Sequence, residues 1–132
     1  MCLLVSSYNN EAYFKAELNL NSIFQQNYTN YMAIIFNDKS TDRSNEIYLR
    51  YFEFYNISKN RYIYFNSHMK KDNIENFYYA GNVYCSENSI MVHIDGDDEL
   101  LGKNVLKVLN SVYQKQKPGF VYSLKHSVYN LA

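Results

Sequence analysis

The sequence has 132 residues with one proline, four glycines, two cysteines and no tryptophan, and what it lacks excludes several classes of protein. Lysine and arginine together number 13, as do aspartate and glutamate, so the formal net charge is zero. No block of Lys or Arg stands out, and the electrostatic footprint of a nucleic-acid-binding protein is missing. No apolar run approaches the roughly 20 residues of a membrane-spanning helix. We therefore expect no nucleic-acid partner and no membrane segment in this chain.

The two cysteines, Cys2 and Cys85, form no C-x-x-C pair and have no metal-ligand spacing. We interpret them as buried free thiols, which are typical of a reducing compartment and favour a cytoplasmic location. No G-x-G-x-x-G or Walker A string occurs, which excludes the common dinucleotide and P-loop sites. No Ser-His-Asp or Cys-His arrangement is recognisable, and the three histidines share no spacing. The sequence thus assigns no catalytic nucleophile.

Strand and helix patterns alternate along what we interpret as a single domain, residues 1–132. Apolar and aromatic runs predict strands at 2–5, 32–36, 62–65, 90–94 and 120–124. Apolar residues at helical spacing predict helices around 12–23, 47–55, 74–84 and 105–112, the first of them capped by Asn9 or Asn10. This alternation predicts an α/β fold, in which right-handed βαβ units build a mainly parallel sheet covered by helices on both faces.

Three polar clusters follow three of the predicted strands. They are SSYNN at 6–10, NDKSTD at 37–42 and DGDDE at 95–99. In an open α/β sheet, ligands bind beyond the carboxyl ends of the strands, and all three clusters belong to that edge. We therefore expect a binding site where these three turns meet.

The acidic turn at 95–99 has two interpretations. Asp95 and Asp97 are two residues apart, a spacing that in a turn can point both carboxylates at one place. Gly96 between them allows a positive φ and the close approach of a ligand to the backbone. Mg²⁺ and Mn²⁺ prefer carboxylate oxygens completed by water and substrate phosphates. The alternative is an acidic first turn that complements the dipole of the following helix. The position of the turn at a strand end favours the metal site.

The other two turns each combine a possible ligand contact with ordinary helix capping. Asp38 can accept hydrogen bonds from a base N–H or a ribose hydroxyl, while Ser40, Thr41 or Asp42 caps the next helix. Tyr8 offers a ring on which a base could stack. A plain helix start capped by asparagine explains the SSYNN cluster equally well.

Taken in order, these turns resemble the motifs of the family-2 glycosyltransferases, which have the GT-A fold. SSYNNE at 6–11 is similar to the family's S-x-Y-N-x-E string, FNDKSTD at 36–42 to its V-D-D-x-S-x-D string, and DGDD at 95–98 to its D-x-D-D string. SIFQQNY at 22–28 resembles a helix end of the family. The resemblance implies a GT-A, Rossmann-like βαβ sandwich. It also implies that the acceptor-side half is not present, so that the domain is C-terminally truncated.

The resemblance further implies roles for single residues. Asp38 would contact the nucleotide base, expected to be uracil, and Ser6 and Tyr8 would line the base pocket. Asp95 would contact the ribose or a metal-bound water. The implied nucleotide-binding residues are thus Ser6, Tyr8, Asp38 and Asp95. Asn37 departs from the family pattern, since it replaces the first acid of the D-D pair.

Asp97 would coordinate a divalent metal, Mn²⁺ or Mg²⁺, that bridges the donor diphosphate, and Asp98 would share that work. The loop after the third strand lacks the family's Gly-rich, Arg-containing string, which leaves the phosphate contacts unassigned.

The activity implied is metal-assisted transfer of a sugar from a nucleotide diphosphate, expected to be UDP-linked, to a hydroxyl of an acceptor glycan, lipid or protein. The general base of such a reaction belongs to the second half, so no catalytic residue is assigned here. An alternative is a non-catalytic nucleotide-binding module that keeps only the donor site. Nucleotidyl transfer on a related sheet is disfavoured, because its basic phosphate loop is missing.

Overall fold

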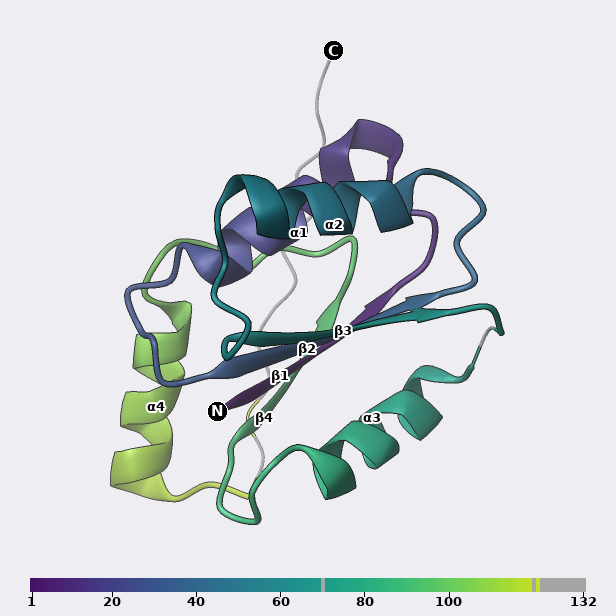
Figure 1. Cartoon of the computed structure of the whole chain (residues 1–132). Coiled ribbons are helices and arrows are strands. Elements are labelled where there is room, and N and C mark those ends of the chain that lie inside the picture. The colour runs from purple at the N-terminus through teal and green to yellow at the C-terminus, as the bar shows by residue number, and fades with distance from the viewer. Residues whose placement is uncertain (70, 120, 122–132) are drawn as a thin grey trace, which may run out of the picture.

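The computed structural model describes residues 1–69, 71–119 and 121, in which helices cover a four-stranded parallel sheet (Figure 1). The strands are β1 (Cys2–Ser7), β2 (Met32–Asp38), β3 (Tyr62–Ser67) and β4 (Met91–Asp95). Their order across the sheet is β3-β2-β1-β4, so β1 has a partner on both sides. The predicted parallel α/β sheet is confirmed. The fifth strand predicted at 120–124 falls on residues of which only Val121 is described.

Helices lie on both faces of the sheet, as expected. They are α1 (Lys15–Phe24), α2 (Ser44–Phe54), α3 (Asn73–Val83) and α4 (Val105–Gln116), with a short 3-10 turn η1 (Ala12–Phe14) before α1. Figure 1 shows α1 and α2 on one face and α3 on the other. Because side chains alternate along a strand, Leu3 and Val5 pack with the α1 and α2 side, whereas Cys2 and Leu4 pack with α3. None of the described helices is long and apolar enough to cross a membrane.

The first helix begins later than predicted. Tyr13 and Phe14 have φ angles of 58° and 56°, in the left-handed region that residues with bulky side chains rarely adopt, so α1 starts only at Lys15. Asn9 and Asn10 therefore cap no helix. The Asn9 side chain bonds to Thr41 in the turn after β2 instead, and the Asn10 amide donates to Ser7 Oγ at the end of β1.

Aromatic residues made the buried face of α3 hard to predict. The expected face included Ile74 and Tyr78, which are both exposed, while Asn76 and Ala80 are buried against the sheet. A tyrosine can rest its ring on the surface with its hydroxyl in water, so its periodicity marks a buried face poorly. A small residue such as Ala80 lets the helix approach the sheet closely.

The prediction of two free thiols is wrong, because Cys2 and Cys85 form a disulfide. Cys2 begins β1 and Cys85 follows α3, and the packing of α3 against the sheet brings their Cα atoms to 6.0 Å. The two residues are 83 positions apart, so only the fold makes them neighbours. Disulfides persist in oxidising environments. The two cysteines therefore do not support the predicted reducing compartment.

Reduction of this disulfide is expected to destabilise the fold. A crosslink that closes a long loop restricts the unfolded chain, and we expect its loss to lower the free energy of unfolding by about 2–4 kcal/mol. Urea unfolding with and without dithiothreitol measures the change. The double variant Cys2→Ala/Cys85→Ala is the control and should not respond to the reductant. Equal unfolding midpoints of the unmodified chain in both conditions would contradict the bond.

Candidate functional site

The carboxyl ends of β1, β2 and β4 bring the three polar turns to one edge of the sheet. In the strand register, Ser6 lies between Phe36 of β2 and Asp95 of β4. Asp38 follows two residues after Phe36, at the end of β2. The predicted convergence of the turns is therefore observed. The ligand contacts assigned to their residues stay predictions.

Close packing, and not backbone strain, explains the glycine in the acidic turn. Gly96 donates its N–H to the Ser6 carbonyl oxygen at 2.7 Å. A Cβ atom on Gly96 would lie 2.6 Å from Asn10 Nδ2, 2.8 Å from Ser7 Cβ and 2.9 Å from the Ser6 oxygen. Gly96 has no positive φ, so the backbone freedom that we predicted for it is not what the turn uses. The turn needs glycine because β1 passes too close for any side chain.

The carboxylates of the acidic turn form an open cluster. Asp95 and Asp97 are exposed and Asp98 is half-buried. Lys15 Nζ lies 3.7 Å from Asp97 Oδ2, so a positive charge already stands beside this carboxylate. Among the described residues, no group of three or more His, Cys, Asp or Glu side chains could enclose a metal ion. The donor set fits a Mg²⁺ or Mn²⁺ ion that takes one or two carboxylates and completes its shell with water and phosphate oxygens.

The beginning of α3 contacts two of the predicted site residues. Asp38 is buried, and its Oδ2 accepts a hydrogen bond from Asn76 Nδ2. Ser6 Oγ donates to Asn73 Oδ1, at the first residue of the helix. Neither asparagine has a role predicted from the sequence. The helical spacing could have indicated Asn76, because it lies four residues before the small residue Ala80 and therefore on the same buried face of α3.

Tyr8, which we predicted to stack on a base, lies after the end of β1 with 45% of its surface exposed. An accessible ring at this edge suits such a role, and the stacking of a base on Tyr8 stays a prediction.

Hydrogen bonds join the turn after β1 to the turn after β2. Asn9 Oδ1 accepts from the Thr41 N–H at 2.8 Å, and the Asn9 N–H donates to Ser40 Oγ at 3.0 Å. The Asn10 N–H donates to Ser44 Oγ at 2.8 Å. Polar residues that looked like helix caps thus connect two turns that are some thirty positions apart in the sequence.

Two carboxylates strengthen this connection. The Glu11 side chain accepts from the Arg43 N–H at 3.0 Å and from Arg43 Nε at 2.7 Å. Asp42 accepts from the Glu11 N–H and also from the Ser44 N–H, each at 3.0 Å. Asp42 thus binds the first N–H of α2, but it precedes the N-cap residue, Arg43, whose own side chain caps no helix N–H, so the predicted N-cap at 40–42 is one residue or more too early.

The pKa values of these two carboxyls predict an acid-sensitive connection. The Arg43 N–H, followed by the Arg43 side chain, holds the pKa of Glu11 below its ordinary 4.5. Partial burial raises the pKa of Asp42, but hydrogen bonds from Ser44 and Glu11 outweigh it and leave that pKa below 3.8. A lowered pKa means that the folded state favours the charged form. The stabilisation is therefore complete above the ordinary values and is lost as the pH falls through the lowered ones.

We accordingly expect the free energy of unfolding to fall between about pH 4.5 and pH 3, and to fall less in the variant Glu11→Gln/Asp42→Asn. Urea unfolding at a series of pH values measures both slopes. Parallel curves for the two proteins would show that these carboxyls do not connect the turns.

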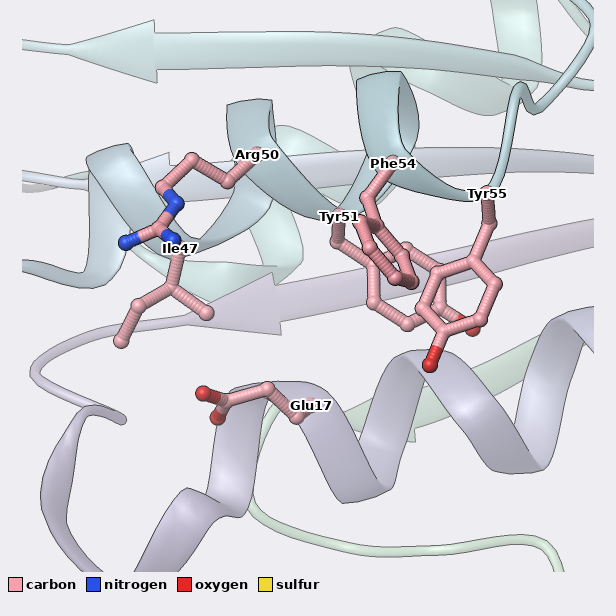
Figure 2. A pocket seen from close by; sticks show the side chains of 6 residues that line it. All are labelled: Glu17, Ile47, Arg50, Tyr51, Phe54 and Tyr55. Carbon is pink, nitrogen blue, oxygen red and sulfur yellow. The ribbon is translucent and has the colours of Figure 1, made fainter.

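A separate groove of about 260 Å³ lies between α1 and α2. Figure 2 shows three aromatic rings at one end of it, with an arginine and a glutamate toward the other. Its lining residues are Glu17, Ile47, Arg50, Tyr51, Phe54 and Tyr55. None of them belongs to the three polar turns, so this groove is not part of the candidate site.

Solved structures of larger proteins share this fold. S. aureus TarS is similar with a TM-score of 0.67 and 20% identity, covering 86% of this chain and 19% of TarS. Residues 1–349 of S. aureus TarS in complex with UDP give a TM-score of 0.66 and 20% identity over 88% of this chain and 32% of that one. The mannosyltransferase PcManGT from Pyrobaculum calidifontis, in complex with GDP-Man and Mn²⁺, gives 0.71 and 18% identity over 87% and 32%. This chain thus spans a third or less of these structures, and at such identities the likeness concerns the fold alone.

A comparison with curated proteins gives no significant match. The sequence model of one family, described as glycosyl transferase family 2, matches residues 2–130. That range includes all three polar turns and nearly the whole chain. The resemblance seen in the motifs is confirmed, and the chain belongs to glycosyl transferase family 2.

Proposed function

We propose that this chain binds a nucleoside diphosphate sugar, UDP-linked, together with Mn²⁺ or Mg²⁺, as the donor-binding half of a glycosyltransferase. The observation that carries the proposal is the meeting of Ser6, Asp38 and Asp95 at the carboxyl edge of three adjacent strands, with Asp97 directly beyond. Ligands of open α/β sheets bind at this edge.

Asp38 is the residue proposed to recognise the base. Its carboxylate is buried, and Asn76 holds one of its oxygens, which fixes its direction. A carboxylate can accept a hydrogen bond from the ring N–H of uracil, and such a bond is stronger in a buried site than in water. Cytosine has no N–H at that ring position. We therefore expect Asp38 to favour uracil over cytosine.

The strand order separates the base end from the diphosphate end. Asp38 belongs to β2 and Asp95 to β4, with β1 between them, so their backbones are about 10 Å apart across the sheet. Ser6 occupies the middle strand. This arrangement gives the nucleoside a place across β1, with its base at Asp38 and its diphosphate at the acidic turn.

Asp97, helped by Asp98, is proposed to hold the metal ion. When bound, the metal supplies positive charge to the departing diphosphate as a Lewis acid. Asp97 is accessible, and the nearby Lys15 ammonium shows that a cation is accommodated beside it.

The structures of related fold in complex with UDP, and with GDP-Man and Mn²⁺, support this class of ligand. Transfer of the sugar to an acceptor glycan, lipid or protein is proposed for the whole protein, with a general base outside the residues assigned here. A longer protein that contains this chain and binds the donor, yet transfers no sugar, would identify the alternative of a non-catalytic nucleotide-binding module.

Calorimetric titration with UDP and CDP, each with and without Mn²⁺, tests the proposal. We expect UDP to bind more tightly than CDP and Mn²⁺ to strengthen the binding. Asp38→Ala should weaken UDP binding about 10-fold and remove the preference over CDP, because a hydrogen bond to a charged group is lost. Glu53→Ala, which removes an exposed carboxylate of α2, is the control and should bind as the unmodified chain does. Undetectable UDP binding to the unmodified chain overturns the proposed function.

A further inference from the structure

Three polar side chains follow one side of α1. Asn19 and Ser22 belong to the helix and Gln26 lies two residues beyond its end. Their spacing of three and four residues places them on the same side. Asn19 and Gln26 are buried and Ser22 is half-buried. Figure 1 shows the segment between β4 and α4 passing beside this helix.

Asn19 and Ser22 hold the acidic turn through its backbone. Asn19 Nδ2 donates to the carbonyl oxygens of Asp95 at 3.1 Å and Asp98 at 2.7 Å. These two residues are also joined by a turn hydrogen bond from the Asp98 N–H to the Asp95 oxygen at 3.0 Å. Ser22 Oγ accepts from the Leu100 N–H at 3.0 Å. One buried amide therefore spans the turn that presents Asp97.

Gln26 holds the other end of the same segment. Its Nε2 donates to the Gly102 oxygen at 2.6 Å, and its Oε1 accepts from the Leu106 N–H at 3.1 Å, at the beginning of α4. The Asn27 N–H adds a bond to the Lys103 oxygen at 2.7 Å. The segment between β4 and α4 is thus held by α1 at its first half and by the two residues Gln26 and Asn27, which follow α1, at its second half.

Stability alone is a poor explanation for the asparagine. Asn19 is fully buried on a face that also presents Ala16, Leu20 and Ile23, where an apolar residue would pack without polar cost. Its Oδ1 is buried and has no hydrogen-bond partner among the described residues. Burying an unsatisfied polar atom is destabilising. The two hydrogen bonds from Asn19 to the Asp95 and Asp98 carbonyl oxygens, which fix the conformation of the turn, account for an asparagine at this position.

We propose that Asn19, Ser22 and Gln26 are positioning residues for the metal–diphosphate end of the site. They contact no ligand themselves, and they fix the backbone from which Asp97 and Asp98 present their carboxylates. The inference rests on the proposed function and deepens it, because it names the residues that hold the acidic turn at a fixed position relative to Asp38 at the base end of the site. Groups that orient metal-binding side chains in this way influence metal affinity strongly.

The test separates metal-dependent from metal-independent binding of UDP. For Asn19→Ala and Ser22→Ala, we expect the factor by which Mn²⁺ strengthens UDP binding to fall about 10-fold, while affinity without metal changes less than about 2-fold. Ser22→Thr keeps the hydroxyl and should restore the metal effect. Hydrogen exchange of the Asp97 and Asp98 amides should be faster in the alanine variants, and that measurement needs no ligand.

Asn45→Ala is the matched control. Asn45 belongs to α2 and accepts from the Tyr64 hydroxyl at 2.9 Å, far from the acidic turn in the sequence, so its loss removes one helix amide without touching that turn. It should leave the Mn²⁺ factor unchanged. Faster amide exchange in the alanine variants with an unchanged Mn²⁺ factor overturns the positioning role. So does a fall of the Mn²⁺ factor in Asn45→Ala that equals the fall in Asn19→Ala and Ser22→Ala. Failure of the unmodified chain to bind UDP overturns the proposed function and this inference together.

Discussion

Asp97→Asn is expected to remove most of the gain in UDP affinity that Mn²⁺ provides. The substitution keeps the size of the side chain and removes the charge, and a hard divalent cation prefers a carboxylate oxygen. Because the described residues offer no enclosed metal site, few other protein ligands can compensate. We expect the Mn²⁺-dependent gain in affinity to fall about 100-fold, with little change in UDP affinity in the absence of metal. Calorimetric titration of UDP at several Mn²⁺ concentrations measures both quantities.

Glu99→Gln is the matched control for this experiment. Glu99 is exposed and lies two residues after Asp97, so the variant removes the same charge from the same segment. Glu99 lies six residues before the first residue of α4, too far to act as an acidic first turn of that helix, and its loss should leave the metal effect nearly intact. An equal effect of both substitutions would mean that the cluster acts only through its total charge. A metal effect that survives Asp97→Asn would remove Asp97 from the metal site.

Gly96→Ala is expected to have the largest effect on stability among the alanine substitutions of the four glycines. The new Cβ would lie 2.8 Å from Ser7 Cβ and 2.9 Å from the Ser6 carbonyl oxygen, and both atoms belong to the central strand β1 or its end. Neither can move without disturbing the sheet. Overpacking of this kind costs about 1–3 kcal/mol, and we expect the upper part of that range because one of the atoms is backbone. Urea unfolding measures the loss.

Gly119→Ala is the control, since a Cβ at Gly119 meets no atom of the described residues within 4 Å and that residue has no positive φ. It should change the free energy of unfolding by less than about 0.5 kcal/mol. If Gly96→Ala were equally mild, the close approach of the acidic turn to β1 would be wrong. A Gly96→Ala variant that folds should also bind UDP less tightly with Mn²⁺, because the turn has been pushed away from Ser6.

The features that the sequence predicted correctly depend on local patterns. Apolar runs at 2–5 and 32–36 lie in β1 and β2, because a strand buried on both faces needs apolar residues throughout. The run at 90–94 overlaps the edge strand β4, in which only Ile94 is buried. Polar clusters directly after these strands then had to meet at one edge, since the strands are parallel. The candidate positions of Ser6, Asp38 and Asp95 follow from that rule together with the family motifs.

Helix faces and helix ends were less predictable. Tyr78 and Phe54 fit the helical period of a buried face and are exposed, because an aromatic ring is tolerated at the surface of a chain that has many. The helix start at Lys15 depends on the left-handed conformations of Tyr13 and Phe14, which no composition rule indicates. These details depend on how the turns after β1 and β2 pack together.

By itself, the sequence determined the strand and helix order, the three polar turns and their place at one edge of a parallel sheet, because these depend on residues near one another in the chain. Only the tertiary structure decided the Cys2–Cys85 disulfide, the contact of Asn76 with Asp38, and the hold of Asn19 on the acidic turn. Each of these joins residues 38 to 83 positions apart. The physical reason is that the packing of helices onto the sheet sets such contacts. The hydrogen-bond partner of a polar residue on a buried helix face can be identified only when that packing is known.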